Sequence, residues 1–95
     1  MVTANDVRLV MTCQAYPEQY DGYVGDEPVA YLRLRNGVFT AQCPHIDSDP
    51  LGFLVNRYVY AERCGHGEFY SDVQRRLELD NAREAIAKWY NDKEG

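Results

Sequence analysis

The sequence predicts an α+β fold, in which a four-stranded antiparallel meander is covered on one face by a C-terminal helix (β-β-β-β-α). Three observations lead to this prediction. The first two thirds of the chain alternate apolar and polar residues, which is typical of half-buried strands. An Asn-Gly pair at 36–37 divides the clearest alternating stretch, as a tight hairpin turn does. Apolar residues then recur at helical spacing over about 71–91.

The length of 95 residues is enough for one domain with a small core. The chain is 45% hydrophobic and 26% charged, which excludes a disordered tail, a collagen-like repeat and a bare coiled coil. We therefore expect a single domain over 1–95, in which residues 1–6 are flexible.

The N-terminal third predicts two strands. Residues 7–14 alternate apolar and polar side chains, and Pro17 is expected to end this strand. A short second strand follows over 19–24. Residues 25–28 predict a turn, because Pro28 cannot donate to a strand ladder.

The central hairpin, residues 29–35 and 38–43, is the clearest element. Its two-residue loop fixes the register, so that Arg35 lies opposite Val38 and Leu34 opposite Phe39. One face must be buried, and it consists of Ala30, Leu32, Leu34, Phe39, Ala41 and Cys43. The other face presents Tyr31, Arg33, Arg35, Thr40 and Gln42.

The C-terminal part predicts a last strand over 57–64, rich in β-forming residues, and then the helix. Ser71 and Gln74 have the spacing of a capping box. The expected core face of the helix is Val73, Leu77, Ala82, Ala85, Ile86 and Trp89, and the expected polar face is Arg75, Glu78, Arg83, Glu84 and Lys88. The segment 46–56 predicts neither a defined element nor a role.

Charge restricts the possible partners. The net charge is −5, so we expect no general binding to nucleic acid, which needs a cationic surface. Eight of the ten basic residues are Arg, the side chain suited to bidentate recognition of carboxylate or phosphate. The sequence has no apolar stretch of membrane-spanning length and no secretory signal. Three cysteines, an odd number, favour a reducing cytoplasm over a disulfide scaffold.

The exposed hairpin face is the first candidate site. This face carries Tyr31, Arg33 and Arg35 at alternate positions of one strand. One of Tyr20 and Tyr23, on the neighbouring strand, should share the face. Arg and Tyr side chains on a rigid sheet suit a planar, anionic ligand. The alternative is that these residues only keep the surface soluble and pack across strands.

A zinc site is the second candidate. Cys43 and His45 form one C-x-H pair, and Cys64 and His66 form another. Two thiolates and two imidazoles satisfy a tetrahedral zinc ion, and no other cofactor is expected. Neither pair has the usual zinc spacing, however, and the hairpin register points Cys43 into the core, where a free cysteine acts as a small hydrophobe.

Catalysis is the third candidate. Glu18, Asp21, Asp26 and Glu27 lie within ten residues, and paired carboxylates would suit a small nuclease or hydrolase. Cys64 and His66 are close enough for nucleophilic chemistry, but a C-x-H pair alone is not a signature. Because no catalytic set is complete, we expect a protein that is not an enzyme.

Two segments carry a resemblance. Residues 17–23 (PEQYDGY) and 31–39 (YLRLRNGVF) resemble a family of small uncharacterised proteins of bacteriophages, prophages and some bacteria. Residues 65–69, Arg76 and 82–86 are similar to the same family. The resemblance implies a phage-encoded binding protein in the host cytoplasm, such as a host-takeover or counter-defence factor. Its partner would be a host protein or a small anionic ligand. The eight tyrosines and the edge strand at 7–14 also suggest a homodimer.

Overall fold

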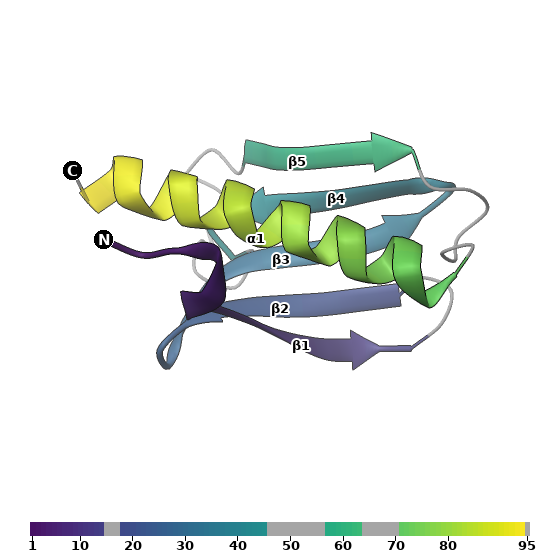
Figure 1. Cartoon of the computed structure of the whole chain (residues 1–95), viewed down its shortest axis with the longest axis horizontal. Coiled ribbons are helices and arrows are strands. Elements are labelled where there is room, and N and C mark those ends of the chain that lie inside the picture. Colours follow the sequence, from purple (N-terminus) through teal and green to yellow (C-terminus); the bar gives the residue numbers. More distant parts are fainter. Residues whose placement is uncertain (15–17, 46–56, 64–70, 95) are drawn as a thin grey trace.

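The structure is a computed structural model, and it describes residues 1–14, 18–45, 57–63 and 71–94. A single antiparallel sheet has the strand order β1-β2-β3-β4-β5, and one long helix crosses one of its faces (Figure 1). The elements in chain order are the 3-10 turn η1 (Ala4–Asp6), β1 (Val7–Cys13), β2 (Glu18–Val24), β3 (Glu27–Arg35), β4 (Val38–Cys43), β5 (Arg57–Arg63) and α1 (Asp72–Glu94).

The α+β class and the meander are confirmed, but the expected number of strands is wrong. The sequence itself indicates five extended segments, including the short one at 19–24, and each of them forms a strand; the last of these strands, counted as the fourth, is in fact the fifth. The sheet therefore has five strands. The expected turn at 65–67 and the segment 46–56 lie outside the described residues.

The β3–β4 hairpin has the predicted turn and register. Asn36 and Gly37 both have positive φ angles, 55° and 78°, as the two-residue turn requires. Arg35 pairs with Val38 and Leu34 pairs with Phe39. Every residue of the predicted buried face is fully buried: Ala30, Leu32, Leu34, Phe39, Ala41 and Cys43.

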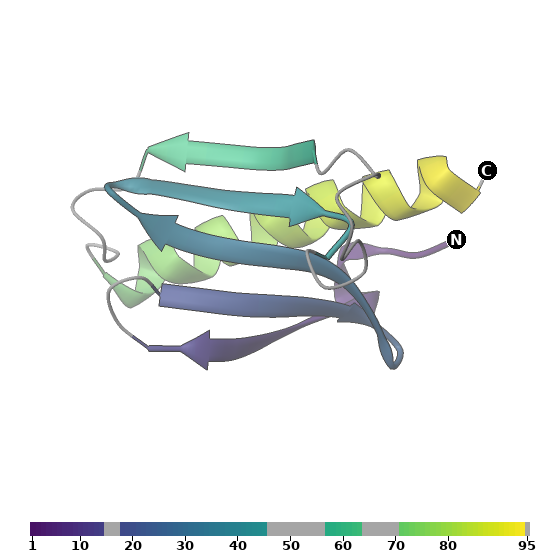
Figure 2. The same cartoon turned by 180° about the vertical axis from the view of Figure 1, so that it is seen from behind.

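The protein has two layers, the sheet and α1. The core lies between them, where Ala82, Ile86 and Ala87 of α1 join the buried side chains of β3 and β4. No described helix lies on the other face of the sheet (Figure 2). The outward side chains of five strands are therefore presented on that second face.

The helix begins as predicted but is rotated in its first half. The Gln74 backbone N–H donates to Ser71 Oγ at 3.1 Å, which is half of the predicted capping box. Val73 and Leu77, both expected in the core, are 80% and 57% exposed. Glu78, expected on the polar face, is buried and accepts a hydrogen bond from the Tyr60 hydroxyl at 2.9 Å. The hydrogen bond of Glu78 and the packing of Leu79 against the core together orient the first half of α1.

The N-terminal segment, which we expected to be flexible, is bonded to the end of α1. The Val2 backbone N–H donates to Asn91 Oδ1 at 2.9 Å, and Asn91 Nδ2 donates to the Val2 carbonyl at 2.7 Å. In addition, the Thr3 backbone N–H donates to Asp6 Oδ2 within the η1 turn. These bonds place the two ends of the chain side by side (Figure 1).

Candidate binding face

The second sheet face, called here the uncovered face, collects polar and aromatic side chains from all five strands. The alternation of the strands and their registers assign its members. They include Arg8, Gln19, Asp21, Tyr23, Tyr31, Arg33, Arg35, Thr40, Gln42, Tyr58 and Arg63, and the same registers add the apolar residues Val10, Val38 and Ala61. Of the residues predicted for the anionic-ligand site, Tyr23, Tyr31, Arg33 and Arg35 lie on this face.

The arginines of the uncovered face give it a positive charge within an acidic protein. Arg33 and Arg35 lie on β3, while Arg8 and Arg63 lie on the two edge strands. Within the described part of the chain none of the four has an ion-pair partner, and Asp21 is the one acidic residue among the members of the face. Among the described residues, therefore, no carboxylate neutralises these four guanidinium groups.

Two tyrosines of the face, Tyr23 and Tyr31, are already in contact with neighbours. The Arg8 guanidinium lies over the Tyr23 ring, 4.7 Å from its centroid, in a cation–π arrangement. The Tyr31 ring meets the His45 ring edge-on, with a centroid distance of 6.2 Å. His45 is buried, and its Nε2 hydrogen-bonds Asp21 Oδ1 at 2.7 Å. A ligand would therefore meet tyrosine rings that are held in place by other groups.

Tyr20, the remaining predicted ligand residue, lies in the core and not on this face. It is 4% exposed, and its hydroxyl donates a hydrogen bond to the buried Glu18 carboxylate. Burial and that hydrogen bond raise the pKa of Tyr20. The prediction that one of Tyr20 and Tyr23 shares the exposed face holds for Tyr23. Tyr20 is removed from the candidate site because it pairs with Leu32, on the helix side of the sheet.

The structure places the two members of the first predicted zinc-binding pair, Cys43 and His45, apart from each other. Cys43 lies in the core under α1, whereas His45 contacts Asp21 and Tyr31 of the uncovered face. The two side chains do not converge, because β4 ends at Cys43 and the strand alternation that would align them stops there. Cys64 and His66 lie outside the described residues. Among the described residues, no group of three or more His, Cys, Asp or Glu could hold a metal ion.

The acidic cluster does not form a pair of catalytic carboxylates. Glu18 is buried on the helix side of β2, and Asp21 lies on the uncovered face beside His45. Asp26 and Glu27 are exposed at the β2–β3 turn. Oxygens that act on one substrate must meet at one point, and these carboxylates point to different sides of the sheet.

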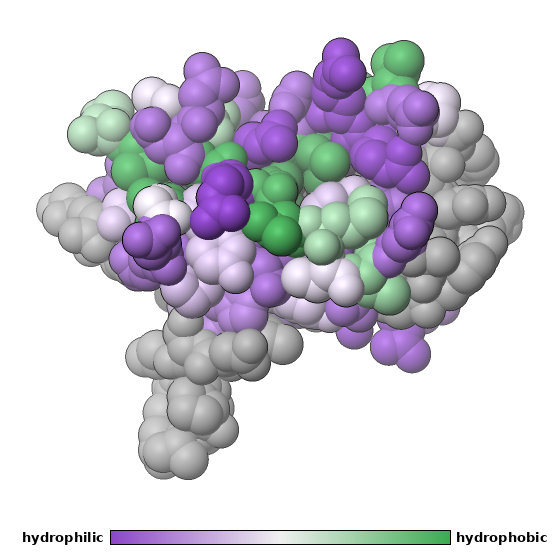
Figure 3. All heavy atoms as spheres, turned by 90° about the horizontal axis from the view of Figure 1, so that it is seen from below, coloured by the Kyte–Doolittle hydropathy of each residue, from purple (hydrophilic) through white to green (hydrophobic). Residues whose placement is uncertain are grey.

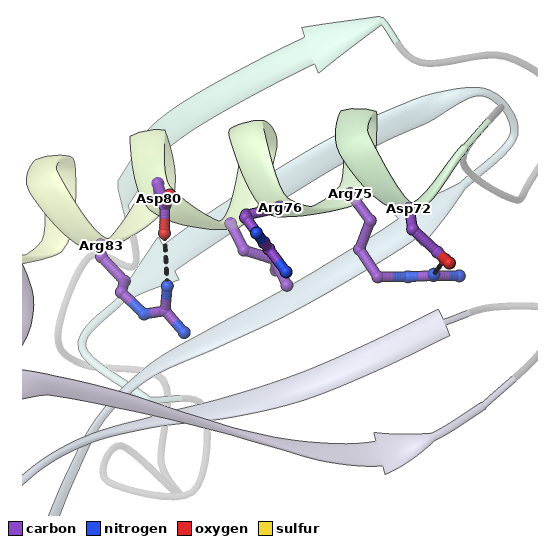
Figure 4. Close-up of a pocket in the computed structure, with 6 residues that line it drawn as sticks. Asp72, Arg75, Arg76, Asp80 and Arg83 are labelled. Carbon is purple, nitrogen blue, oxygen red and sulfur yellow. Dashed lines mark hydrogen bonds and ion pairs between the residues drawn. The ribbon is translucent and has the colours of Figure 1, made fainter.

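A second arginine-rich site, which the sequence reasoning missed, lies along one side of α1 (Figure 4). A cavity of about 450 Å³ is lined by Asp72, Arg75, Arg76, Leu79, Asp80 and Arg83. The i, i+3 and i, i+4 spacing of these residues was the signal that could have revealed it.

The charges of this cavity are nearly balanced internally. Arg75 Nη1 donates to Asp72 at 2.6 Å, and Arg83 Nη1 donates to Asp80 at 2.5 Å. Arg75 also binds the buried Glu18, whose hydrogen bonds raise the pKa of the guanidinium. Only Arg76 has no ion-pair partner among the described residues. An anion would have to displace existing partners here, so the uncovered face is the stronger candidate.

None of the described helices is both long and apolar enough to cross a membrane. Comparison with known proteins gave no match, whether to a family model, to a curated protein or to a solved structure.

Proposed function

We propose that the chain is a binding protein whose uncovered face recognises an acidic patch on a partner protein. The observation that carries this proposal is the charge of the face: four arginines against one aspartate, in a protein of net charge −5. Arg33 and Arg35 form the centre of the site. Their planar guanidinium groups match carboxylates in bidentate geometry.

The extent of the face favours a protein surface over a single nucleotide. Arg8 lies on the first strand of the sheet and Arg63 on the last. Four strand spacings separate them, a width of about 19 Å. One nucleotide would contact only part of this width, whereas an acidic protein patch could meet all four guanidinium groups.

One observation weighs against stacking of a nucleic acid base at Tyr23, because the Arg8 guanidinium already lies over its ring. The net charge of −5 does not distinguish the two classes of partner, because at long range it repels an acidic protein patch and a polyphosphate alike.

In the setting that the sequence resemblance implies, the partner would be a host protein, met in the host cytoplasm by a phage-encoded factor. Such a factor would act by occupying its target, as in host takeover or counter-defence. Binding alone suffices for this role, and none of the four arginines is required to perform chemistry.

The test uses a labelled oligoglutamate peptide as the probe and compares two matched charge reversals by fluorescence anisotropy. Arg35→Glu changes the uncovered face, and Arg76→Glu changes another exposed arginine, on α1. We expect Arg35→Glu to weaken peptide binding about tenfold and Arg76→Glu to leave it within about twofold. Circular dichroism verifies that both variants fold.

Equal losses in the two variants, or no binding by the natural sequence, would show that the face is not an acidic-peptide site. A labelled single-stranded oligonucleotide of equal charge provides the second arm. If it binds more tightly than the peptide and loses affinity in Arg35→Glu, the partner class is nucleic acid and the proposal is wrong.

A further inference from the structure

The two edges of the sheet differ in how they are protected against pairing. Edge strands usually carry charges that discourage association with another strand. β5 has three charged residues, Arg57, Glu62 and Arg63, whereas β1 has only Arg8. At the same time Val10 and Met11 of β1 are 38% and 43% exposed. Figure 3 looks onto this edge and shows apolar side chains gathered there, bordered by hydrophilic ones.

We propose that β1 pairs antiparallel with β1 of a second copy of the chain, about a twofold axis at Val10. In this register Val10 faces Val10 of the other copy, and Leu9 faces Met11. Such a pairing can form whichever backbone groups of β1 point outward, because Val10 can occupy either a hydrogen-bonded or a non-hydrogen-bonded pair. The inference does not depend on the proposed function.

The side chains of this register are self-complementary on both faces. Leu9 and Met11 point to the helix side, because their partners on β2 are Gly22 and Tyr20. Each Leu9 would therefore meet a Met11 beneath the α1 layer, and these contacts occur twice. Val10 lies on the opposite side of the sheet and would meet its own copy. Three apolar pairs result, and cross-strand pairs of this kind stabilise a sheet.

The single charge of β1 does not oppose this pairing. Arg8 would face Thr12. The two copies of Arg8 would be four residues apart along the strand direction and one strand spacing apart across it, a direct distance of about 14 Å. That separation exceeds the screening length of about 8 Å at physiological ionic strength, so repulsion between them is small.

β1 is irregular between Met11 and Cys13, where Thr12 has no partner on β2, so the regular pairing of the two copies is limited to residues 9–11. Because the interface is short, we expect a weak dimer, which dissociates when the protein is diluted to about 1 μM. The twofold axis would be perpendicular to the sheet, so the uncovered faces of the two copies would lie on the same side. Together they would form one continuous ten-stranded surface.

Sedimentation of the full chain tests this pairing. We expect mainly dimer at about 1 mM and monomer at about 1 μM. Val10→Lys places two like charges directly opposite each other and should leave the protein monomeric at both concentrations. Ala61→Lys is the matched control, since Ala61 is an exposed residue of the other edge strand, β5. It should dimerise like the natural sequence.

Charge complementation tests the register itself. Val10→Lys mixed with Val10→Glu should restore a dimer, because only a pairing of residue 10 with residue 10 brings the two charges together. A monomer at about 1 mM, loss of the dimer in Ala61→Lys alone, or no complementation would each overturn the proposal. Circular dichroism of each variant distinguishes loss of pairing from loss of folding.

Discussion

Arg75 and Glu18, 57 positions apart in the sequence, form a two-pronged hydrogen bond between α1 and β2. Nε and Nη2 of the guanidinium donate to the two carboxylate oxygens at 3.0 and 3.1 Å. Glu18 is 2% exposed and also accepts the Tyr20 hydroxyl. A carboxylate this deeply buried is tolerated only because each of its oxygens has a donor.

We predict that Arg75→Ala destabilises the protein strongly. The change leaves Glu18 buried with its cationic partner removed, which costs about 3 kcal/mol in the free energy of unfolding. Arg76→Ala is the control, because Arg76 is the adjacent, exposed arginine and should change stability by less than about 0.5 kcal/mol. Urea denaturation measures both. Equal effects of the two substitutions would show that the Glu18 pair contributes nothing.

Alkaline pH should destabilise the protein through the buried Tyr20 and the partly buried Tyr60. Burial and the hydrogen bond to Glu78 raise the pKa of Tyr60 to about 12, and the pKa of Tyr20 is raised as well. A raised tyrosine pKa stabilises the folded state below the unfolded value of about 10, and this contribution is lost as the pH rises through the folded pKa. The free energy of unfolding should therefore fall between about pH 10 and pH 12. In Tyr60→Phe the fall should be smaller, and an unchanged slope would contradict the assignment to Tyr60.

Removal of the Asn91 side chain should release the N-terminal segment. Asn91→Ala deletes two hydrogen bonds to the Val2 backbone, with an expected cost of about 1–2 kcal/mol. Asn5→Ala, in the exposed η1 turn, is the matched control. Hydrogen exchange should become faster over residues 1–6 in the Asn91 variant only. Protection that persists there would mean that other contacts hold the segment.

A side chain at Gly22 should strain the sheet. A Cβ at this position would lie 3.1 Å from the Ala30 Cβ and 3.3 Å from Leu9 Cδ2, and the Ala30 atom is fixed to its backbone. Gly22→Ala should therefore cost about 1–3 kcal/mol in thermal or urea unfolding. Gly25→Asn is the contrasting variant: Gly25 has a φ of 62° and open space around it, and Asn tolerates that conformation. If Gly22→Ala were as stable as Gly25→Asn, close packing at Gly22 would be refuted.

The sequence predicts this fold best where local rules determine the structure. The Asn36-Gly37 turn sets the β3–β4 register without help from the rest of the chain, so the buried and exposed faces follow from counting. The rotation of α1 is different, because Arg75 and Glu78 face the sheet only through partners on β2 and β5. Helical periodicity treats both residues as solvent-facing, and for this reason it wrongly placed Val73 and Leu77 in the core.

The candidate site, like the fold, was predictable where a local turn fixes the register and not where the pairing of distant segments does. Arg33 and Arg35 are placed by the hairpin alone, and Tyr31 with them. Arg8 and Arg63 join the uncovered face through the β1–β2 and β4–β5 registers, which no short turn motif fixes. Tyr20 and Tyr23 could be separated only once the pairing of β2 with β3 was known.

The arginines of the uncovered face give the molecule an electric asymmetry that acts before any contact is made. An acidic surface approaching from a distance meets a net charge of −5 and is repelled. Within about one screening length, 8–10 Å at physiological salt, it senses only the face nearest to it. Added salt screens the long-range repulsion between the two negatively charged molecules. It weakens the attraction between an arginine of the face and a carboxylate in direct contact with it much less. Over the lower range of ionic strength, association through this face should therefore become faster as salt is added, the opposite of steering between proteins of opposite net charge.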